Sequence, residues 1–140
     1  MMINMKIKEI VKAYKTLGEA NISMLEESEI IKIISARSDM RQHVEKYDAY
    51  MQDVKDKFKP EGYDQVLIKA QKWHDLSDDE KIEINKIVKE YETRVNNAMA
   101  ELNNKEVDIN IEKLEKCSAV KILKYNNWLP NKLDEIAIML

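Results

Sequence analysis

The stretch KEVDINIEKL, Lys105 to Leu114, decides how this chain folds. Its apolar residues alternate strictly with polar ones, which is the period of a half-buried β-strand and differs from the helical pattern of the surrounding sequence. The residues that point to the apolar side are Val107, Ile109 and Ile111. A strand has to pair with another strand, so a strand over 106–111 predicts a second strand elsewhere in the chain.

The candidate for that second strand is the stretch EANISML, because Ala20, Ile22 and Met24 alternate with polar residues. We predict a strand over about 20–25 that pairs with 106–111 in a two-stranded antiparallel ribbon. Ile22 and Ile109 would lie on its buried face. Two strands alone are marginally stable in water, so helices have to cover the apolar face.

The composition predicts a mainly α protein with a minor β component. The chain has 140 residues, with two glycines, two prolines and 35% charged residues, a balance typical of long helices. No Gly-, Ser- or Pro-rich stretch offers a linker, so we predict a single domain over 1–140.

Two long helices are expected, at about 28–58 and 78–103, because apolar residues recur at alternating spacings of three and four in both. Between them, Pro60 and Gly62 break the helical pattern. A short helix over about 63–73 would cap the far end of the resulting antiparallel hairpin, 28–103. Ser77 and Glu80 have the spacing of a capping box at the start of the second long helix.

The two ends of the chain are predicted to form short helices. An amphipathic helix precedes Gly18, which is suited to end it. The segment 115–140 should form two short helices, the second starting near Pro130, and these should close the core over the ribbon.

Single residues within these segments raise two further expectations. Cys117 cannot form an internal disulfide and is expected to be a packed core thiol. Arg37 interrupts the apolar seam of the first long helix, where it should either extend its charge into solvent or pair with a carboxylate of the opposite helix.

Charge and hydropathy exclude several partners. Lys and Arg total 23 against 26 Asp and Glu, and the charges are interspersed, so no basic stripe is available for nucleic acid. No apolar run approaches the length of a membrane span, so no membrane partner is expected. A single cysteine and the lack of an N-terminal apolar segment favour the cytoplasm of a cell.

No residue pattern in the sequence defines a reaction or a cofactor site. His43 and His74 are far apart in sequence and lack metal-ligand spacing, and two glycines cannot build a glycine-rich nucleotide loop. We therefore expect no catalytic residues, no metal and no cofactor, and a non-enzymatic protein. The alternative is a small enzyme with a site near His74, Asp75 and Asp78.

An interaction surface is the better-supported hypothesis, because aromatic and apolar residues gather near the tip of the predicted hairpin. These side chains would either close the tip or anchor a protein partner, which includes a second copy of the chain. The candidate interface residues are Tyr50, Phe58, Tyr63, Trp73 and Leu76.

The order of segments resembles that of a family of small, uncharacterised, mainly helical proteins encoded by tailed bacteriophages and by prophages of gut bacteria. The matching segments are ANISM, a long charged helix, KPEGYDQVLIKAQKWHDLSDDEK, a second long helix, NKEVDINIEKL and LDEIAIML. The resemblance covers nearly the whole chain and implies a phage or prophage origin. It implies no catalytic residues and supports a protein that acts by interaction, such as an accessory structural or assembly factor. The same resemblance implies a place in the cytoplasm of a bacterial host cell or on a virion, and it adds a host-directed inhibitor with a site near His74 as an alternative.

Overall fold

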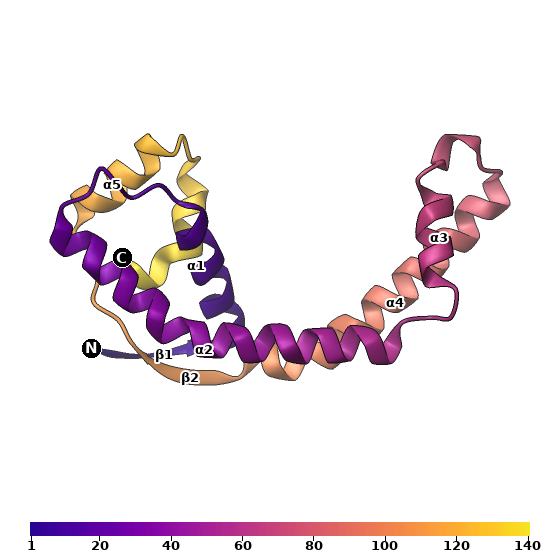
Figure 1. Ribbon diagram of the computed structural model, residues 1–140, viewed down its shortest axis with the longest axis horizontal. Coiled ribbons are helices and arrows are strands. Elements are labelled where there is room, and N and C mark those ends of the chain that lie inside the picture. Colours follow the sequence, from indigo (N-terminus) through magenta and orange to yellow (C-terminus); the bar gives the residue numbers. More distant parts are fainter. The chain divides into compact units, whose positions relative to one another are not determined.

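The computed structural model describes all 140 residues and divides into two compact units. Unit 1 comprises Met1–Asp48 and Leu102–Leu140, and unit 2 comprises Ala49–Glu101. The expected class, a mainly helical protein with a two-stranded antiparallel sheet, is confirmed, with 74% of residues in helices. The long helices α2 (Glu27–Phe58) and α4 (Asp78–Asn104) each continue from one unit into the other (Figure 1). Because neither helix is interrupted there, no linker composition marks the boundary.

The sheet of unit 1 pairs β2 with the start of the chain. β2 (Glu106–Asn110) forms where the alternation predicts it, and Ile109 is buried, with 3% of its surface exposed. Its antiparallel partner is β1 (Met2–Lys6), with Ile3 opposite Ile109. The prediction that residues 20–25 supply the partner strand, with Ile22 on the buried face, is wrong: Ile22 is half-buried in a loop.

Side-chain hydrogen bonds hold residues 20–25 in a loop. The backbone N–H of Asn21 donates to Oδ1 of Asn126 at 2.8 Å, and Nδ2 of Asn126 donates to the backbone carbonyl of Asn21 at 2.9 Å. Oδ1 of Asn21 accepts from the backbone N–H of Ser23 at 3.0 Å, which forms a local turn. These bonds use the backbone groups that a strand would need, so the alternation of ANISML does not lead to a sheet.

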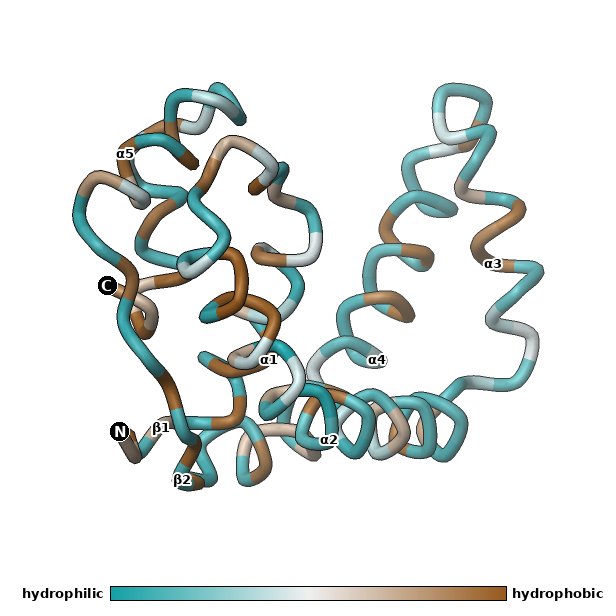
Figure 2. Tube along the Cα trace, turned by 60° about the vertical axis from the view of Figure 1, so that its left-hand side comes forward, coloured by the Kyte–Doolittle hydropathy of each residue, from teal (hydrophilic) through white to brown (hydrophobic).

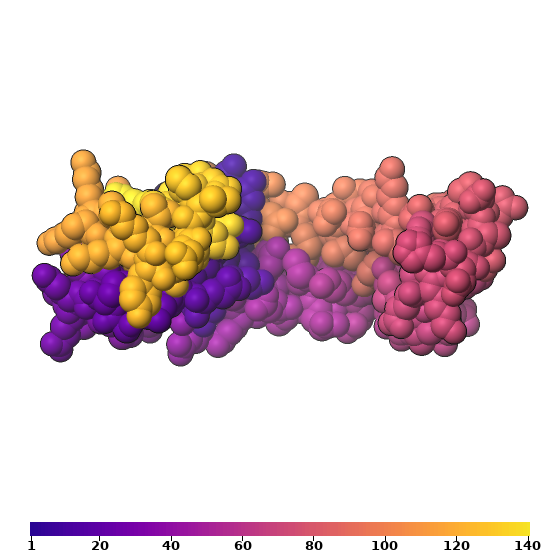
Figure 3. Space-filling view, turned by 90° about the horizontal axis from the view of Figure 1, so that it is seen from above, coloured from indigo at the N-terminus to yellow at the C-terminus, as the bar shows by residue number.

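Short helices cover the sheet and complete unit 1. α1 (Ile7–Glu19) buries one amphipathic face, formed by Ile7, Ile10, Val11, Ala13, Thr16 and Leu17. Gly18 lies inside its last turn instead of after it, because the helix continues to Glu19. The two short C-terminal helices are confirmed as α5 (Lys116–Tyr125) and η2 (Pro130–Met139), a 3-10 helix that starts at Pro130. Figure 3 shows these orange and yellow segments packed on the indigo and purple helices.

Glu29 connects α2 to the N-terminus of α5 and has only 2% of its surface exposed. Its Oε1 accepts hydrogen bonds from the hydroxyl of Ser118 at 2.6 Å and the backbone N–H of Glu115 at 2.7 Å. Nζ of Lys32 lies 2.7 Å from Oε2. The bonds from Lys32, Ser118 and Glu115 outweigh burial and lower the pKa of Glu29 from 4.5 to about 2. Glu29 is therefore charged at neutral pH and caps the amide end of α5.

A second carboxylate joins η2 to α1. Oε2 of Glu135 accepts a hydrogen bond from the hydroxyl of Thr16 at 2.6 Å and lies 3.0 Å from Nζ of Lys132, while Lys12 lies 3.4 Å from Oε1. The bonds from Thr16 and Lys132 lower the pKa of Glu135 to about 2. The C-terminal segment is thus held by polar contacts as well as by apolar burial.

Two residues differ from their sequence-based expectations. Arg37 neither extends into solvent nor pairs with a carboxylate: its guanidinium lies 4.1 Å from the ring centroid of Tyr14, and Nε donates to the Tyr14 carbonyl at 3.3 Å. Cys117 is exposed rather than packed in the core. α5 instead buries Ser118, Ala119 and Ile122, because Glu29 draws the Ser118 side of the helix inward.

Candidate interaction site

The candidate site is built on the helical hairpin tip of unit 2. After α2 ends at Phe58, Gly62 adopts a φ of 76°, and the N–H of Tyr63 donates to the Pro60 carbonyl at 3.1 Å. This turn leads into α3 (Tyr63–Ala70), which is followed by the short 3-10 helix η1 (Trp73–Asp75). The expected break at Pro60 and Gly62 is confirmed, whereas the short helix ends at Ala70 instead of near Trp73.

Tyr63 and Tyr91 join the three helices of the tip. Their ring centroids lie 4.7 Å apart with the planes inclined by 50°, a tilted geometry that favours aromatic pairs. The hydroxyl of Tyr91 donates to the carbonyl of Lys55 near the end of α2 at 3.0 Å. Burial, followed by the nearby Tyr91, raises the pKa of Tyr63. Tyr63 therefore closes the tip.

A capping box begins α4, as the sequence predicts. The N–H of Glu80 donates to Oγ of Ser77 at 3.2 Å, while the N–H of Ser77 donates to Oε1 of Glu80 at 3.4 Å. Oε2 of Glu80 also lies 2.6 Å from Nζ of Lys69 in α3. The bonds from Lys69 and Ser77 lower the pKa of Glu80. This ion pair fixes the end of α3 beside the first turn of α4.

A small hollow of about 150 Å³ lies beside Phe58. The hollow is lined by Phe58 at the end of α2, by Pro60 in the turn, and by four residues of α4: Ile87, Glu90, Tyr91 and Arg94. Its size is suited to one inserted side chain and is below the usual range for small-molecule sites.

The most exposed apolar residues of unit 2 lie on α3 and the start of α4. Ile68 and Ile82 have 61% and 67% of their surfaces exposed, and Leu67 and Tyr50 are also exposed. α3 contains no buried residue, although Figure 2 shows hydrophobic segments along it. The apolar residues of α3 thus contribute little to the core, and its two exposed ones form what we call the α3 surface: Leu67 and Ile68.

The five residues predicted as an interface all belong to unit 2 but differ in their surroundings. Tyr63 packs on Tyr91, Phe58 borders the hollow, and Tyr50 is exposed. Trp73 and Leu76 are half-buried, with Nζ of Lys81 lying 5.6 Å from the Trp73 ring centroid. Sequence reasoning missed Ile68 and Ile82. Both fall outside the apolar seams of their helices, and that position is the signal that could have revealed them.

The residues of the alternative enzymatic site lie on the surface of unit 2. His74, Asp75 and Asp78 are all exposed and exchange no hydrogen bond or ion pair with one another. The structure contains no cluster of three or more His, Cys, Asp or Glu side chains arranged to hold a metal ion. None of its helices combines the length and apolar character needed to cross a membrane.

Comparison with family models, curated proteins and solved structures finds no match. Inference about function therefore depends on the residues and geometry of this chain.

Proposed function

We propose that the chain is a non-enzymatic protein–protein interaction protein that binds another protein through the α3 surface. The observation that carries this proposal is the exposure of Leu67 and Ile68 on a short helix with no buried residue. Fully burying an Ile or Leu side chain is worth about 1.5–3 kcal/mol. A partner that covers this surface would obtain that free energy, whereas the isolated chain does not.

The fixed position of the surface supports the same function. The Lys69–Glu80 ion pair and the Tyr63–Tyr91 contact attach α3 to α4 at its two ends. A surface held in place before binding loses less conformational entropy when the partner docks. Tyr50 and the hollow beside Phe58 offer further contact positions in the same unit.

Origin and cellular role form a further part of the proposal: a phage- or prophage-encoded accessory structural or assembly factor. The support is the order of segments described above together with the exposed apolar residues of the α3 surface. Neighbouring genes for virion or assembly proteins would support this role. A gene neighbourhood of metabolic enzymes would contradict it.

A double variant, Leu67→Ser with Ile68→Ser, tests the α3 surface. Because neither side chain is buried, we expect the thermal midpoint to change by no more than about two degrees, as is usual for surface substitutions. The immobilised full chain would be used to capture proteins from a lysate of phage-infected bacteria. The double variant should fail to capture at least one protein that the parent captures. Once purified, that protein should bind the parent at least about tenfold more tightly than it binds the double variant.

The matched control is Gln65→Ser, an exposed polar position on the same helix. It should capture the same proteins as the parent. If the double variant, shown to be folded, captures the same proteins with the same affinities as Gln65→Ser, the α3 surface is not an interaction site and the proposed function loses its support.

A further inference from the structure

The outer edge of β1 has backbone groups that no other part of the chain uses. Ile111 N–H donates to the Met1 carbonyl and Ile7 N–H to the Lys105 carbonyl, each at 2.9 Å. With Ile3 opposite Ile109, these bonds show that odd-numbered residues of β1 exchange hydrogen bonds with β2. The main-chain groups of Met2 and Asn4, and the N–H of Lys6, therefore point away from β2. None of them bonds to another backbone group.

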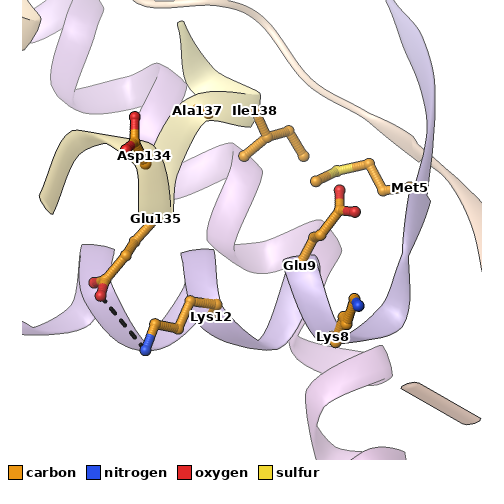
Figure 4. A pocket seen from close by; sticks show the side chains of 8 residues that line it. All are labelled: Met5, Lys8, Glu9, Lys12, Asp134, Glu135, Ala137 and Ile138. Carbon is orange, nitrogen blue, oxygen red and sulfur yellow. Dashed lines mark ion pairs between the residues drawn. The ribbon is translucent and has the colours of Figure 1, made fainter. Parts of the chain in front are cut away.

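An open hollow borders this edge. It has a volume of about 500 Å³ and is lined by residues of β1, α1 and η2, with none from β2. Figure 4 shows the side chains of Met5 of β1 and Ile138 of η2 extending toward each other, with the Glu9 carboxylate of α1 below Met5. A strand added beside β1 would lie along the mouth of this hollow and could place alternate side chains into it.

The sequence of β1 is complementary to itself. If two copies of β1 pair antiparallel about Asn4, the Asn4 main-chain groups of the two copies bond to each other. Lys6 N–H then donates to the Met2 carbonyl of the other copy. Ile3 of each copy lies beside Met5 of the other, at the mouth of the hollow. On the outer face, Met2, which is 64% exposed, lies opposite the aliphatic stem of Lys6.

Charge distinguishes this edge from the outer edge of β2. The corresponding pairing of two β2 strands would be centred on Asp108, so that the carboxylates of the two copies face each other. Like charges directly opposite across strands are destabilising. Pairing of β1 with β2 of another copy is head-to-tail and would not close into a dimer. Of these three pairings, only that of β1 with β1 about Asn4 joins two copies by a two-fold axis without like charges opposite each other.

We propose that β1 pairs with β1 of a second copy of the chain, which joins the two sheets into one antiparallel sheet of four strands across a two-fold axis. The surface involved belongs to unit 1 and is separate from the α3 surface of unit 2. The proposal therefore goes beyond the proposed function, and each can fail without the other.

The test compares Asn4→Pro with Asp108→Pro by sedimentation of the full chain over a wide concentration range. Asn4 and Asp108 are opposite each other, and the N–H of each points outward, so both prolines keep the β1–β2 hydrogen bonds and lose the same Asn4–Asp108 side-chain bond. Only Asn4→Pro removes a backbone N–H from the outer edge of β1. Because each copy loses this donor, the dimer loses two hydrogen bonds. At about 0.5–1.5 kcal/mol per bond, its dimer dissociation constant should rise about tenfold or more. Asp108→Pro should keep the dissociation constant of the parent.

Two substitutions of Met2 provide the measurement if a proline variant does not fold. Met2→Glu should tighten the dimer several-fold, because the carboxylate would face Lys6 of the other copy, and Met2→Lys should weaken it several-fold. A parent that is monomeric at every concentration overturns the proposal and leaves this edge to a strand of another protein. Equal dissociation constants for the two proline variants, or for the two Met2 variants, would also overturn it.

Discussion

Replacing Ile109 with aspartate is expected to unfold unit 1. Ile109 has 3% of its surface exposed and lies opposite Ile3 on the apolar side of the sheet. The buried residues of the chain include no lysine, arginine or histidine that could pair with a carboxylate at this position. A buried, unpaired carboxylate costs several kcal/mol, a large part of the total stability of a typical domain. The variant should therefore lose the tryptophan fluorescence signature of folded unit 1, reported by Trp128 in a Trp73→Phe background.

Asn110→Asp is the matched control for this substitution. It introduces the same side chain one residue further along β2, where the position is exposed and points to the other face of the sheet. Its free energy of unfolding should stay within about 0.5 kcal/mol of the parent. Equal melting temperatures for Ile109→Asp and Asn110→Asp would show that the sheet does not bury Ile109.

Glu29 is expected to make the stability of unit 1 dependent on pH. Its pKa is about 2 in the folded chain against 4.5 as the ordinary value. A carboxyl group with a lowered folded pKa stabilises the fold above its unfolded pKa and loses that contribution as the pH falls through the folded pKa. The shift corresponds to about 3 kcal/mol or slightly more. Urea unfolding followed by Trp128 should show this stability at pH 7 and its progressive loss between about pH 5 and pH 2.

Glu29→Gln separates this carboxylate from the others that titrate in the same range, such as Glu135. At pH 7 the variant should lose about 3 kcal/mol relative to the parent, because the amide no longer pairs with Lys32 and forms weaker bonds with Ser118 and the α5 amide end. Near pH 2 the two proteins should approach the same stability. Glu112→Gln, at an exposed carboxylate of the same unit, should differ little from the parent at either pH. A deficit for Glu29→Gln that stays constant with pH would show that its carboxylate charge contributes nothing.

Local sequence signals were sufficient for much of the fold. The extents of α2 and α4, the break at Pro60 and Gly62, the Ser77–Glu80 capping box and the alternating strand β2 are set by neighbouring residues, so they could be predicted. The partner of β2 could not be identified in this way. MINMK and ANISM both alternate, and MINMK continues directly into α1, so its strand character was hidden by the helical pattern that follows.

Contacts between residues distant in sequence decided the remaining features. Asn126 binds the backbone of Asn21 and removes that loop from the sheet. Glu29 bonds to Ser118 and so sets which face of α5 is buried, which leaves Cys117 exposed. At the candidate site, aromatic composition indicated the hairpin tip. The contact with Tyr91 determined that Tyr63 packs inside, and the exposure of Ile68 and Ile82 followed from three-dimensional packing alone.

The pairing of β1 with β2 is the central claim, because it builds unit 1 and leaves the open edge at which we place a second copy. It is tested most directly by nuclear Overhauser effects between α-hydrogens across the sheet. Asn4 and Asp108 form a pair without mutual main-chain hydrogen bonds, in which the α-carbons approach to about 4.5 Å. We predict a strong effect between the α-hydrogens of Asn4 and Asp108. Cross-strand effects from Asp108 to residues 20–25, with none to Asn4, would contradict the account.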